Sequence, residues 1–457
     1  MHDQLFWLSA TELLRHYRRH ELSPVEVIRT VTARIERLEP QLNAFVLWDA
    51  EAALGAARAS EARWQRNAPL GLLDGVPLSV KDLLLTRGWP TRRGSRTVAS
   101  EGPWEHDAPA VARVREQGAV LLGKTTTTEF GLKGSSASPL TGVTKNPWHP
   151  GYTTGGSSAG AVAAIAAGLG PLALATDGGG SIRVPSAYTG VVGFKPTFGR
   201  VPAHPAGFVG VPPHVGPIAR SVEDAALLFT VIAQPDARDP FAASAGERDY
   251  REALGRSWQR VRIGVSTLGY ADIDPEIAAA FERAARVFAE LGATLEAADP
   301  ELGSPAAVLR VLFAARAAHT VAGLTPAQRE LLDPDVERSA REGERLTALE
   351  YLEAEAQRVV LAQALARYHQ RYDLLLTPAT AWPAPALDAP KPQLSSPFTF
   401  PFSLTRQPAI SVPAGLSRVG LPIGIQIVGR HFDDALVLAA AHAFEGQSPF
   451  PRLGELR

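Results

Sequence analysis

The chain has 457 residues, of which 45% are hydrophobic and 20% are charged, and its formal net charge at pH 7 is −1. These values are typical of a soluble globular protein and give no electrostatic reason to expect a nucleic acid or an anionic membrane as a partner. The sequence contains no cysteine, which excludes disulfides, thiolate metal sites and a cysteine nucleophile. The length allows two or three domains, or one large α/β domain.

No segment has the pattern of a leader sequence or of a membrane span. Charged residues interrupt residues 1–19, where a signal peptide needs an apolar core. The one long, weakly polar run, residues 161–175, is short for a membrane span and is broken by glycine and proline. We therefore expect a cytoplasmic protein that does not bind membranes.

The N-terminal segment is predicted to form helices. Ser9 and Ser23 each stand three residues before a glutamate, which is the capping-box pattern, and a proline follows Ser23 at the first helical position. Pro40 is expected to end the second helix, and a third helix, rich in alanine and arginine, follows. Nothing in these helices suggests chemistry of their own, so we expect residues 1–66 to pack on a larger catalytic body formed by residues 67–457.

Short apolar runs replace the helical pattern from about residue 73. Apolar residues alternate with other types over residues 76–80, so Lys81 projects from one face of a predicted strand, near its end. A lone lysine at such a position is usually exposed. The alternative is a base for a serine nucleophile that has no obvious histidine partner.

Residues 118–125 match the phosphate-loop pattern G-x-x-x-x-G-K-T. A phosphate loop follows a strand, and its middle residues form the loop itself. Here the middle residues 119–122 are apolar and predict a strand, whereas the preceding residues 106–117 predict a helix. Because this order of elements is wrong for a phosphate loop, we do not expect nucleotide binding at this segment.

Two glycine-flanked serine clusters, residues 155–158 and 178–181, are the most informative part of the chain. A predicted helix and a predicted buried strand join them. Dense glycine lets backbone N–H groups turn towards one point, and a serine at the end supplies a nucleophile. One such cluster is commonly a flexible loop. Two clusters with the Lys81 segment before them and Gly-Phe-Lys-Pro-Thr at 193–197 after them are much harder to obtain by accident.

The second half of the chain is predicted to alternate helices and strands. A helix begins at Ser221, and a longer helical block begins at the capping box of Thr347 and extends to about Tyr372. A strand–helix–strand unit is expected over residues 261–265, 275–291 and 293–298, and later strands over residues 374–378, 408–413 and 421–429.

These motifs, in this order, resemble the amidase signature family, whose members hydrolyse amides with a serine–cis-serine–lysine triad. The resemblance extends over roughly residues 73–429, and its specific motifs lie within residues 75–199. It implies an α/β fold: a single α/β/α domain with a central mixed β-sheet surrounded by helices. It implies no cofactor and no metal.

An amide is a poor electrophile with a poor leaving group, so its hydrolysis needs an activated nucleophile, charge stabilisation and a proton for the departing amine. The resemblance implies that Ser181 is the nucleophile and that Lys81, deprotonated by burial, is the base. It implies that Ser157 relays the proton between them, after a cis peptide bond that joins it to Gly156.

The resemblance also assigns roles around the nucleophile. Backbone N–H groups would form an oxyanion hole, supplied by Gly178, Gly179, Gly180 and Ser181. Asp177 and Arg183 would brace the turn, and Ser158 would support it through hydrogen bonds. Three consecutive glycines suit such a loop because side chains would obstruct both the turn and the approaching carbonyl group.

A competing enzyme class is the α/β-hydrolases. Residues 156–160 fit the nucleophile-elbow pattern G-x-S-x-G, with Ser158 as the nucleophile. That fold requires an acid and a histidine downstream, and it leaves Lys81 and the triple glycine without a role. The downstream histidines are isolated in the sequence: His319, His369, His431 and His442.

A second alternative is the A subunit of a tRNA-dependent amidotransferase, which shares the motifs but works with partner subunits and releases ammonia from glutamine. Residues 338–371 do not resemble the corresponding region of that protein, which favours a stand-alone amidase, either a monomer or a homodimer. Arg406 would either reach a substrate or lie at the surface.

The expected substrate is a small-molecule amide or carbamate. We predict a preference for aryl or apolar amides, with carbamates (urethanes) and esters as further substrates, because one acyl-enzyme route serves all of them. Apolar residues in variable segments would line the pocket: Phe208, Val209, Val211, Leu312, Phe313, Trp382, Phe398, Phe400 and Phe402.

Overall fold

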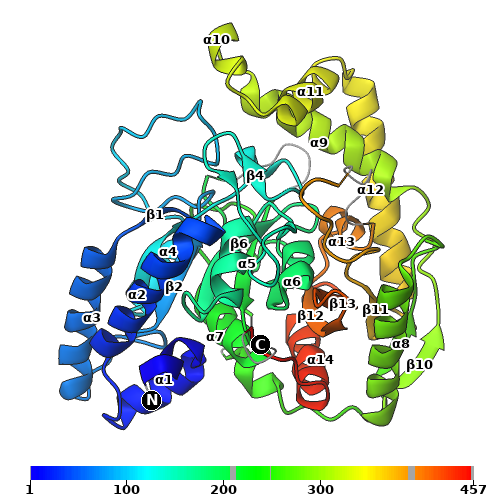
Figure 1. Ribbon diagram of the computed structural model, residues 1–457. Coiled ribbons are helices and arrows are strands. Elements are labelled where there is room, and N and C mark those ends of the chain that lie inside the picture. The colour runs from blue at the N-terminus through cyan, green and yellow to red at the C-terminus, as the bar shows by residue number, and fades with distance from the viewer. Residues whose placement is uncertain (1, 206–212, 247–248, 390–396, 454–457) are drawn as a thin grey trace.

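The computed structural model describes residues 2–205, 213–246, 249–389 and 397–453 (Figure 1). Eleven strands of the described residues form one sheet, in the order β1-β3-β2-β6-β8-β7-β12-β13-β11-β9-β10. Their bounds are β1 Phe45–Trp48, β2 Pro77–Lys81, β3 Val120–Thr125, β6 Leu172–Asp177, β7 Val192–Lys195, β8 His214–Ala219, β9 Arg262–Val265, β10 Thr294–Ala297, β11 Leu374–Pro378, β12 Ala409–Leu416 and β13 Pro422–Gly429. A separate two-stranded sheet pairs β4 Ala137–Ser138 with β5 Gly142–Val143.

The main sheet is mixed, as the family resemblance implies. Strands β3, β2 and β6 run parallel to one another, as do β11, β9 and β10, whereas the strands between these two groups pair antiparallel. The strand–helix–strand unit predicted in the second half is confirmed as β9, α8 and β10, with its two strands parallel and adjacent.

Helices surround the sheet, and Figure 1 shows α10 and α11 projecting at the top, away from the N-terminal helices. None of the helices in the described parts of the chain is long and apolar enough to cross a membrane. Their bounds are α1 Ala10–Arg18, α2 Pro24–Leu42, α3 Ala50–Gln65, α4 Pro109–Glu116, α5 Ala159–Ala166, α6 Arg183–Thr189, α7 Val222–Ile232, α8 Pro275–Glu290, α9 Pro305–Val321, α10 Pro326–Arg329, α11 Pro334–Gly343, α12 Ala348–Tyr368, α13 Phe400–Leu404 and α14 Asp434–Gln447, with short 3-10 turns at His2–Trp7, Glu129–Gly131 and Tyr250–Ala253.

Strand β6 shows how the two faces of the sheet are filled. Leu172 and Leu174 contribute to a large core shared with α4, α7, α8 and α14. Ala173 and Ala175 face the other way, against α5, which consists of alanine, glycine, valine and isoleucine. Side chains alternate along a strand, so the leucine–alanine alternation separates the two layers. The small residues let α5 lie close to the sheet.

The N-terminal helices α1 to α3 share one core with α5 and β3. Residues 45–48 within this segment form β1, an edge strand of the main sheet that pairs with β3. This four-residue strand was not predicted, because it is too short to show an alternating pattern. The division of the chain at residue 66 stays a prediction.

Pro40 does not end α2, and this prediction is wrong by two residues. The helix continues to Leu42, and Asn43, in the left-handed conformation, closes it by donating its N–H to the carbonyl oxygen of Glu39. Pro40 lies inside the last turn of the helix, where it removes one i→i−4 hydrogen bond without ending the helix at once. The helix predicted over residues 106–117 exists as α4 but is shorter at both ends, and the helix predicted between the two serine clusters exists as α5.

Strand β8 lies in the middle of the sheet, although its sequence, HVGPIA, predicts a loop. Proline in a strand removes one ladder hydrogen bond and normally argues against a central position. Here Pro217 pairs with Leu174 of β6, whereas β7 on the other side pairs only with Ile218 and Ala219. Pro217 therefore lies beyond the end of the β7 ladder, where no N–H is needed.

Candidate active site

The order of the strands brings the Lys81 segment next to the strand that lies between the two serine clusters. Strands β2 and β6 are parallel neighbours, and Val80 lies opposite Leu174. The carboxyl ends of parallel strands meet at one edge of a sheet, so Lys81 at the end of β2 lies beside Thr176 at the end of β6. Helix α5 begins at the same edge, with Ser158 as its N-cap residue.

Lys81 is fully buried, and the amine at the end of its side chain contacts several hydroxyl and carbonyl oxygens. Its Nζ lies 2.8 Å from the hydroxyl oxygen of Ser157 and 2.8 Å from that of Ser158. It also lies 2.9 Å from Oγ1 of Thr176 and 3.2 Å from the carbonyl oxygen of the same residue. The alternative that Lys81 is an exposed surface lysine is therefore wrong.

Burial also lowers the pKa of Lys81 well below its usual value. The carboxylate of Asp177 opposes this effect, and the guanidinium of Arg316 adds to it. Desolvation penalises the charged ammonium form, so burial favours the neutral amine. In that form the lone pair of Nζ can accept a proton, as a base must.

Ser157 stands between the amine of Lys81 and a cavity. Its peptide bond with Gly156 is cis, as the resemblance implies. A Cβ atom on Gly156 would collide with the carbonyl oxygen of Ser135, so only glycine fits there. The Ser157 hydroxyl accepts a hydrogen bond from Lys81 and lines the cavity, which puts it in a position to pass protons.

Ser158, the nucleophile of the α/β-hydrolase alternative, is fully buried and does not line that cavity. Its hydroxyl accepts from Lys81 and donates to the carbonyl oxygen of Thr176, 3.3 Å away. Among the described contacts, no histidine reaches it: His369 and His431 bind backbone carbonyl oxygens, and His442 contacts Glu445. Ser158 thus lies beside Lys81 and does not reach the cavity wall.

Ser181 ends the second cluster and is partly exposed to solvent. Its hydroxyl has no hydrogen-bond partner within the described parts of the chain, and neither have the backbone N–H groups of Gly178, Gly179 and Ser181 itself. The N–H of Gly180 is different, because it donates to Oδ1 of Asp177 at 2.7 Å. Gly180 is therefore removed from the predicted oxyanion hole, which retains three available donors.

Asp177 and Arg183 hold this loop through a fully buried ion pair. Nε and Nη2 of Arg183 each lie 3.0 Å from a carboxylate oxygen of Asp177. The remaining N–H groups of Arg183 bind Gln426, Ser403 and the carbonyl oxygen of Thr399, so all of its donors are used. Burial raises the pKa of the Asp177 carboxyl, but the charge and hydrogen bonds of Arg183 outweigh this and hold it below its usual range.

Replacing Arg183 by methionine is therefore expected to destabilise the fold by about 3–5 kcal/mol, because it leaves the buried Asp177 carboxylate without its counter-charge. Urea denaturation measures this change. Arg338→Met, at a site that is 66% exposed, is the matched control and should stay within about 0.5 kcal/mol of the parent protein. An equal effect of the two substitutions would contradict the bracing role.

A cavity of about 270 Å³ opens beside Ser157 and Gly178. Its wall is mixed, with apolar residues, prolines, hydroxyl groups and two arginines. The described residues that line it are Leu83, Leu84, Arg93, Ala108, Ala110, Phe130, Gly131, Ser157, Thr176, Gly178, Pro202, Ala203, His204, Pro205, Pro213, Val215, Arg316 and Thr320.

None of the described residues that were predicted to line a substrate pocket lines this cavity. Leu312, Phe400 and Phe402 belong to a buried core shared by α9, α12 and α13. Phe313 comes nearest to the site, since a Cβ on Gly179 would lie 3.5 Å from its ring. Phe398 is also fully buried, Trp382 is half-buried, and neither lines the cavity. Phe208, Val209 and Val211 lie outside the described residues.

Sequence reasoning missed three residues at the site. Thr176 and Arg93 stand beside motifs that were recognised, but neither residue type is distinctive. Arg316 lies on α9, a helix that was not predicted although Ser304 and Pro305 give a typical helix start.

Arg406, for which the sequence left both a substrate contact and a surface position open, packs its guanidinium over the ring of Phe198, 4.5 Å from the centroid. It does not line the cavity.

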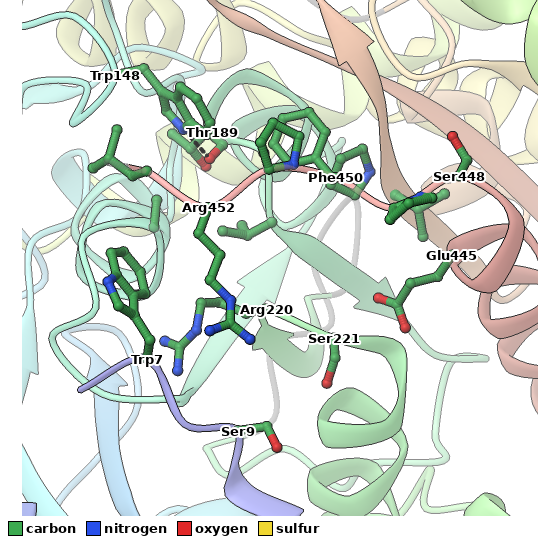
Figure 2. Close-up of a pocket in the computed structure, with 18 residues that line it drawn as sticks. Trp7, Ser9, Trp148, Thr189, Arg220, Ser221, Glu445, Ser448, Phe450 and Arg452 are labelled. Atoms are coloured by element: carbon green, nitrogen blue, oxygen red, sulfur yellow. Dashed lines mark hydrogen bonds between the residues drawn. The ribbon is translucent and has the colours of Figure 1, made fainter. Parts of the chain in front are cut away.

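A second cavity of about 270 Å³ lies at the opposite edge of the sheet (Figure 2). Arg220, which lines it, follows the end of β8 that pairs with Leu172, whereas Asp177 pairs with the other end of β8. Figure 2 shows Arg220 near Arg452, with Ser9, Ser221 and Ser448 around them. None of the described residues lining this cavity is a lysine or a histidine, so its serines lack the lysine base that Ser157 has.

The comparisons with known proteins agree with the geometry. The family model Amidase matches residues 26–438. The chain is 36% identical over 470 residues to the acylamidase of Rhodococcus erythropolis, covering 98% of this chain and 97% of that protein. It is also 36% identical over 482 residues to the A subunit of the glutamyl-tRNA(Gln) amidotransferase of Myxococcus xanthus, covering 98% and 99% of the two chains. A crystal structure of a bacterial aryl acylamidase superimposes with a TM-score of 0.92 at 30% identity, covering 97% and 96%.

Proposed function

The chain belongs to the amidase signature family, and on this premise we propose that it is a stand-alone amidase that works through an acyl-enzyme on Ser181. The observation that supports this most is the buried amine of Lys81, 2.8 Å from the hydroxyl of Ser157, which in turn lines a cavity. A buried neutral amine joined to a serine at a cavity supplies the base that an amide-cleaving serine needs.

In the proposed reaction, Ser181 Oγ attacks the amide carbon and its proton passes through the Ser157 hydroxyl to Nζ of Lys81. The N–H groups of Gly178, Gly179 and Ser181 stabilise the oxyanion. The lysine proton then returns through Ser157 to the departing amine, and water releases the acyl group by the same route. No hydrogen bond joins Ser181 to Ser157 in the described structure, so substrate binding has to draw them together, as is common for catalytic contacts.

We propose aryl or apolar amides as the substrate class, with carbamates and esters as further substrates. The similarity to an acylamidase and to an aryl acylamidase supports this class. The apolar part of the cavity, which includes Leu83 and Phe130, supports it as well.

The alternative is the A subunit of a tRNA-dependent amidotransferase, and the 36% identity to the Myxococcus xanthus protein supports it. The two functions differ in what the purified chain does alone. A stand-alone amidase is active without partners, whereas the amidotransferase component uses glutamine and depends on its complex.

A substrate screen of the purified chain decides between them. Anilides, aliphatic amides, glutamine and aryl carbamates are compared by kcat/KM. We expect aryl and apolar amides to exceed glutamine by about tenfold or more, the range that apolar contacts in a pocket provide. Hydrolysis of glutamine alone would overturn the stand-alone proposal.

A further inference from the structure

The charged residues that line the candidate active-site cavity, among those that the structure describes, are both arginines. Arg93 and Arg316 line it, and none of the described residues lining it is an aspartate or a glutamate. Burial lowers the pKa of Lys81, behind Ser157, and the carboxylate of Asp177 that acts on it does not line the cavity. A partly enclosed cavity with this lining attracts anions, because low-dielectric walls strengthen the field.

Arg93 is held firmly by its backbone while its guanidinium is unengaged. Its N–H donates to the carbonyl oxygen of Asp82 at 3.1 Å, and its own carbonyl accepts from the N–H of Phe130 at 2.8 Å. The half-buried Arg93 side chain has no hydrogen-bond or ion-pair partner in the described structure. Its neighbour Arg92, in contrast, donates to the carbonyl oxygen of Val98. Arg93 is thus a positioned cation at the cavity wall.

Arg316 reaches the same cavity from α9. A Cβ atom on Gly178 would lie 3.3 Å from Nη1 of Arg316, so this guanidinium stands next to the first glycine of the oxyanion loop. Burial lowers the pKa of Arg316 to about 10, which leaves the side chain charged at neutral pH. Two cations from distant segments therefore line the space that a substrate would fill next to Ser157.

We propose that the substrate carries a carboxylate, bound by Arg93 and Arg316, and that these arginines select such substrates among amides. The inference rests on the proposed amidase function and deepens it. Guanidinium groups bind carboxylates through paired, charge-assisted hydrogen bonds, which are stronger than neutral ones. A zwitterion such as glutamine fits less well, since its ammonium group would meet no acidic residue among those described at the cavity.

Two matched pairs of substrates test the proposal, because the carboxylate is placed once in the acyl half and once in the amine half. The first pair is the mono-para-nitroanilide of glutaric acid and the para-nitroanilide of hexanoic acid. The second pair is hexanoyl-para-aminobenzoate and hexanoyl-para-toluidine. The quantity measured is the ratio of kcat/KM for the charged member to that for the neutral member.

We expect this ratio to exceed about 10 in at least one pair, the effect of one or two hydrogen bonds to a charged group. The ratio should fall towards one in the variants Arg93→Gln and Arg316→Gln. The variants Arg93→Lys and Arg316→Lys keep a positive charge and should retain part of the preference for the charged substrate. Arg87→Gln, at an exposed site outside the cavity, is the matched control and should leave it unchanged. Urea denaturation shows whether each variant is folded.

A ratio at or below one in both pairs overturns the proposal, as does a ratio that survives in both glutamine variants. If Arg316→Gln lowers kcat/KM equally for the charged and the neutral substrates, Arg316 supports the oxyanion loop, residues 178–181, and does not bind the carboxylate. If no amide is hydrolysed, the amidase proposal fails separately. Calorimetric titration of the glutaric anilide into Ser181→Ala then decides the anion site: binding that Arg93→Gln abolishes supports it, and absence of binding refutes it.

Discussion

Lys81→Met is expected to lower kcat by about 10³-fold or more, the loss usually seen when the base of a catalytic unit is removed. Methionine keeps the apolar stem of the side chain but cannot accept the proton that leaves Ser157. Steady-state kinetics on an anilide substrate measure the loss. The matched control is Lys124→Met, since Lys124 is also buried but binds Leu84 and Thr91 away from the serines. That variant should lose stability yet retain most of its kcat per folded molecule.

The pH profile gives the same prediction a second readout. Burial places the pKa of Lys81 below the ordinary lysine value of 10.5, and only the deprotonated amine accepts a proton. Activity should therefore rise with pH through an apparent pKa below 10.5 and level off once Lys81 is neutral. Lys81→His should move this rise in activity to a different pH. A variant with near-parental rates and an unchanged profile would be incompatible with Lys81 as the base.

Ser181→Ala should abolish acyl-enzyme formation, and Ser157→Ala should be nearly as damaging because it breaks the proton path to Lys81. Ser158→Ala should be much milder, because Ser158 only supports the site through hydrogen bonds worth about 0.5–1.5 kcal/mol each. Burst kinetics and kcat for the three variants measure this order. The α/β-hydrolase alternative predicts the reverse, with Ser158 essential and Ser181 dispensable.

Combined substitutions sharpen the result. Residues that act as one unit lose little more when a second member is removed. The double variant of Ser157 and Ser181 should therefore be about as inactive as Ser181→Ala alone. Additive losses would mean that the two serines act independently, which the proton relay does not allow.

Much of the fold is readable in the sequence because the relevant signals are local. The alternation before Lys81 and the alanine–leucine pattern of β6 both predict strands, and both are confirmed. The strand predicted at residues 119–122 is confirmed as β3, Val120–Thr125, and the amine of Lys124 is buried against protein groups where a phosphate loop would expose it. The resemblance to the family supplied the mixed sheet surrounded by helices, whereas the order of the strands was not predicted.

The remaining features depend on tertiary structure. Strand β8 has a loop-like sequence, and only its partners β6 and β7 show why Pro217 is tolerated. The use of the Gly180 N–H by Asp177 follows from how the loop folds back, which glycine content cannot reveal. The cavity wall combines Arg93 with Arg316, 223 residues apart in a chain of 457, so no motif could have paired them.

The central claim is that Ser181 is the nucleophile, and covalent labelling tests it most directly. A fluorophosphonate probe reacts with an activated serine, and mass spectrometry of the digested protein locates the modified peptide. Labelling should depend on Lys81 and follow the same rise with pH as hydrolysis. We predict the label on Ser181, and a label on Ser158 would contradict the account.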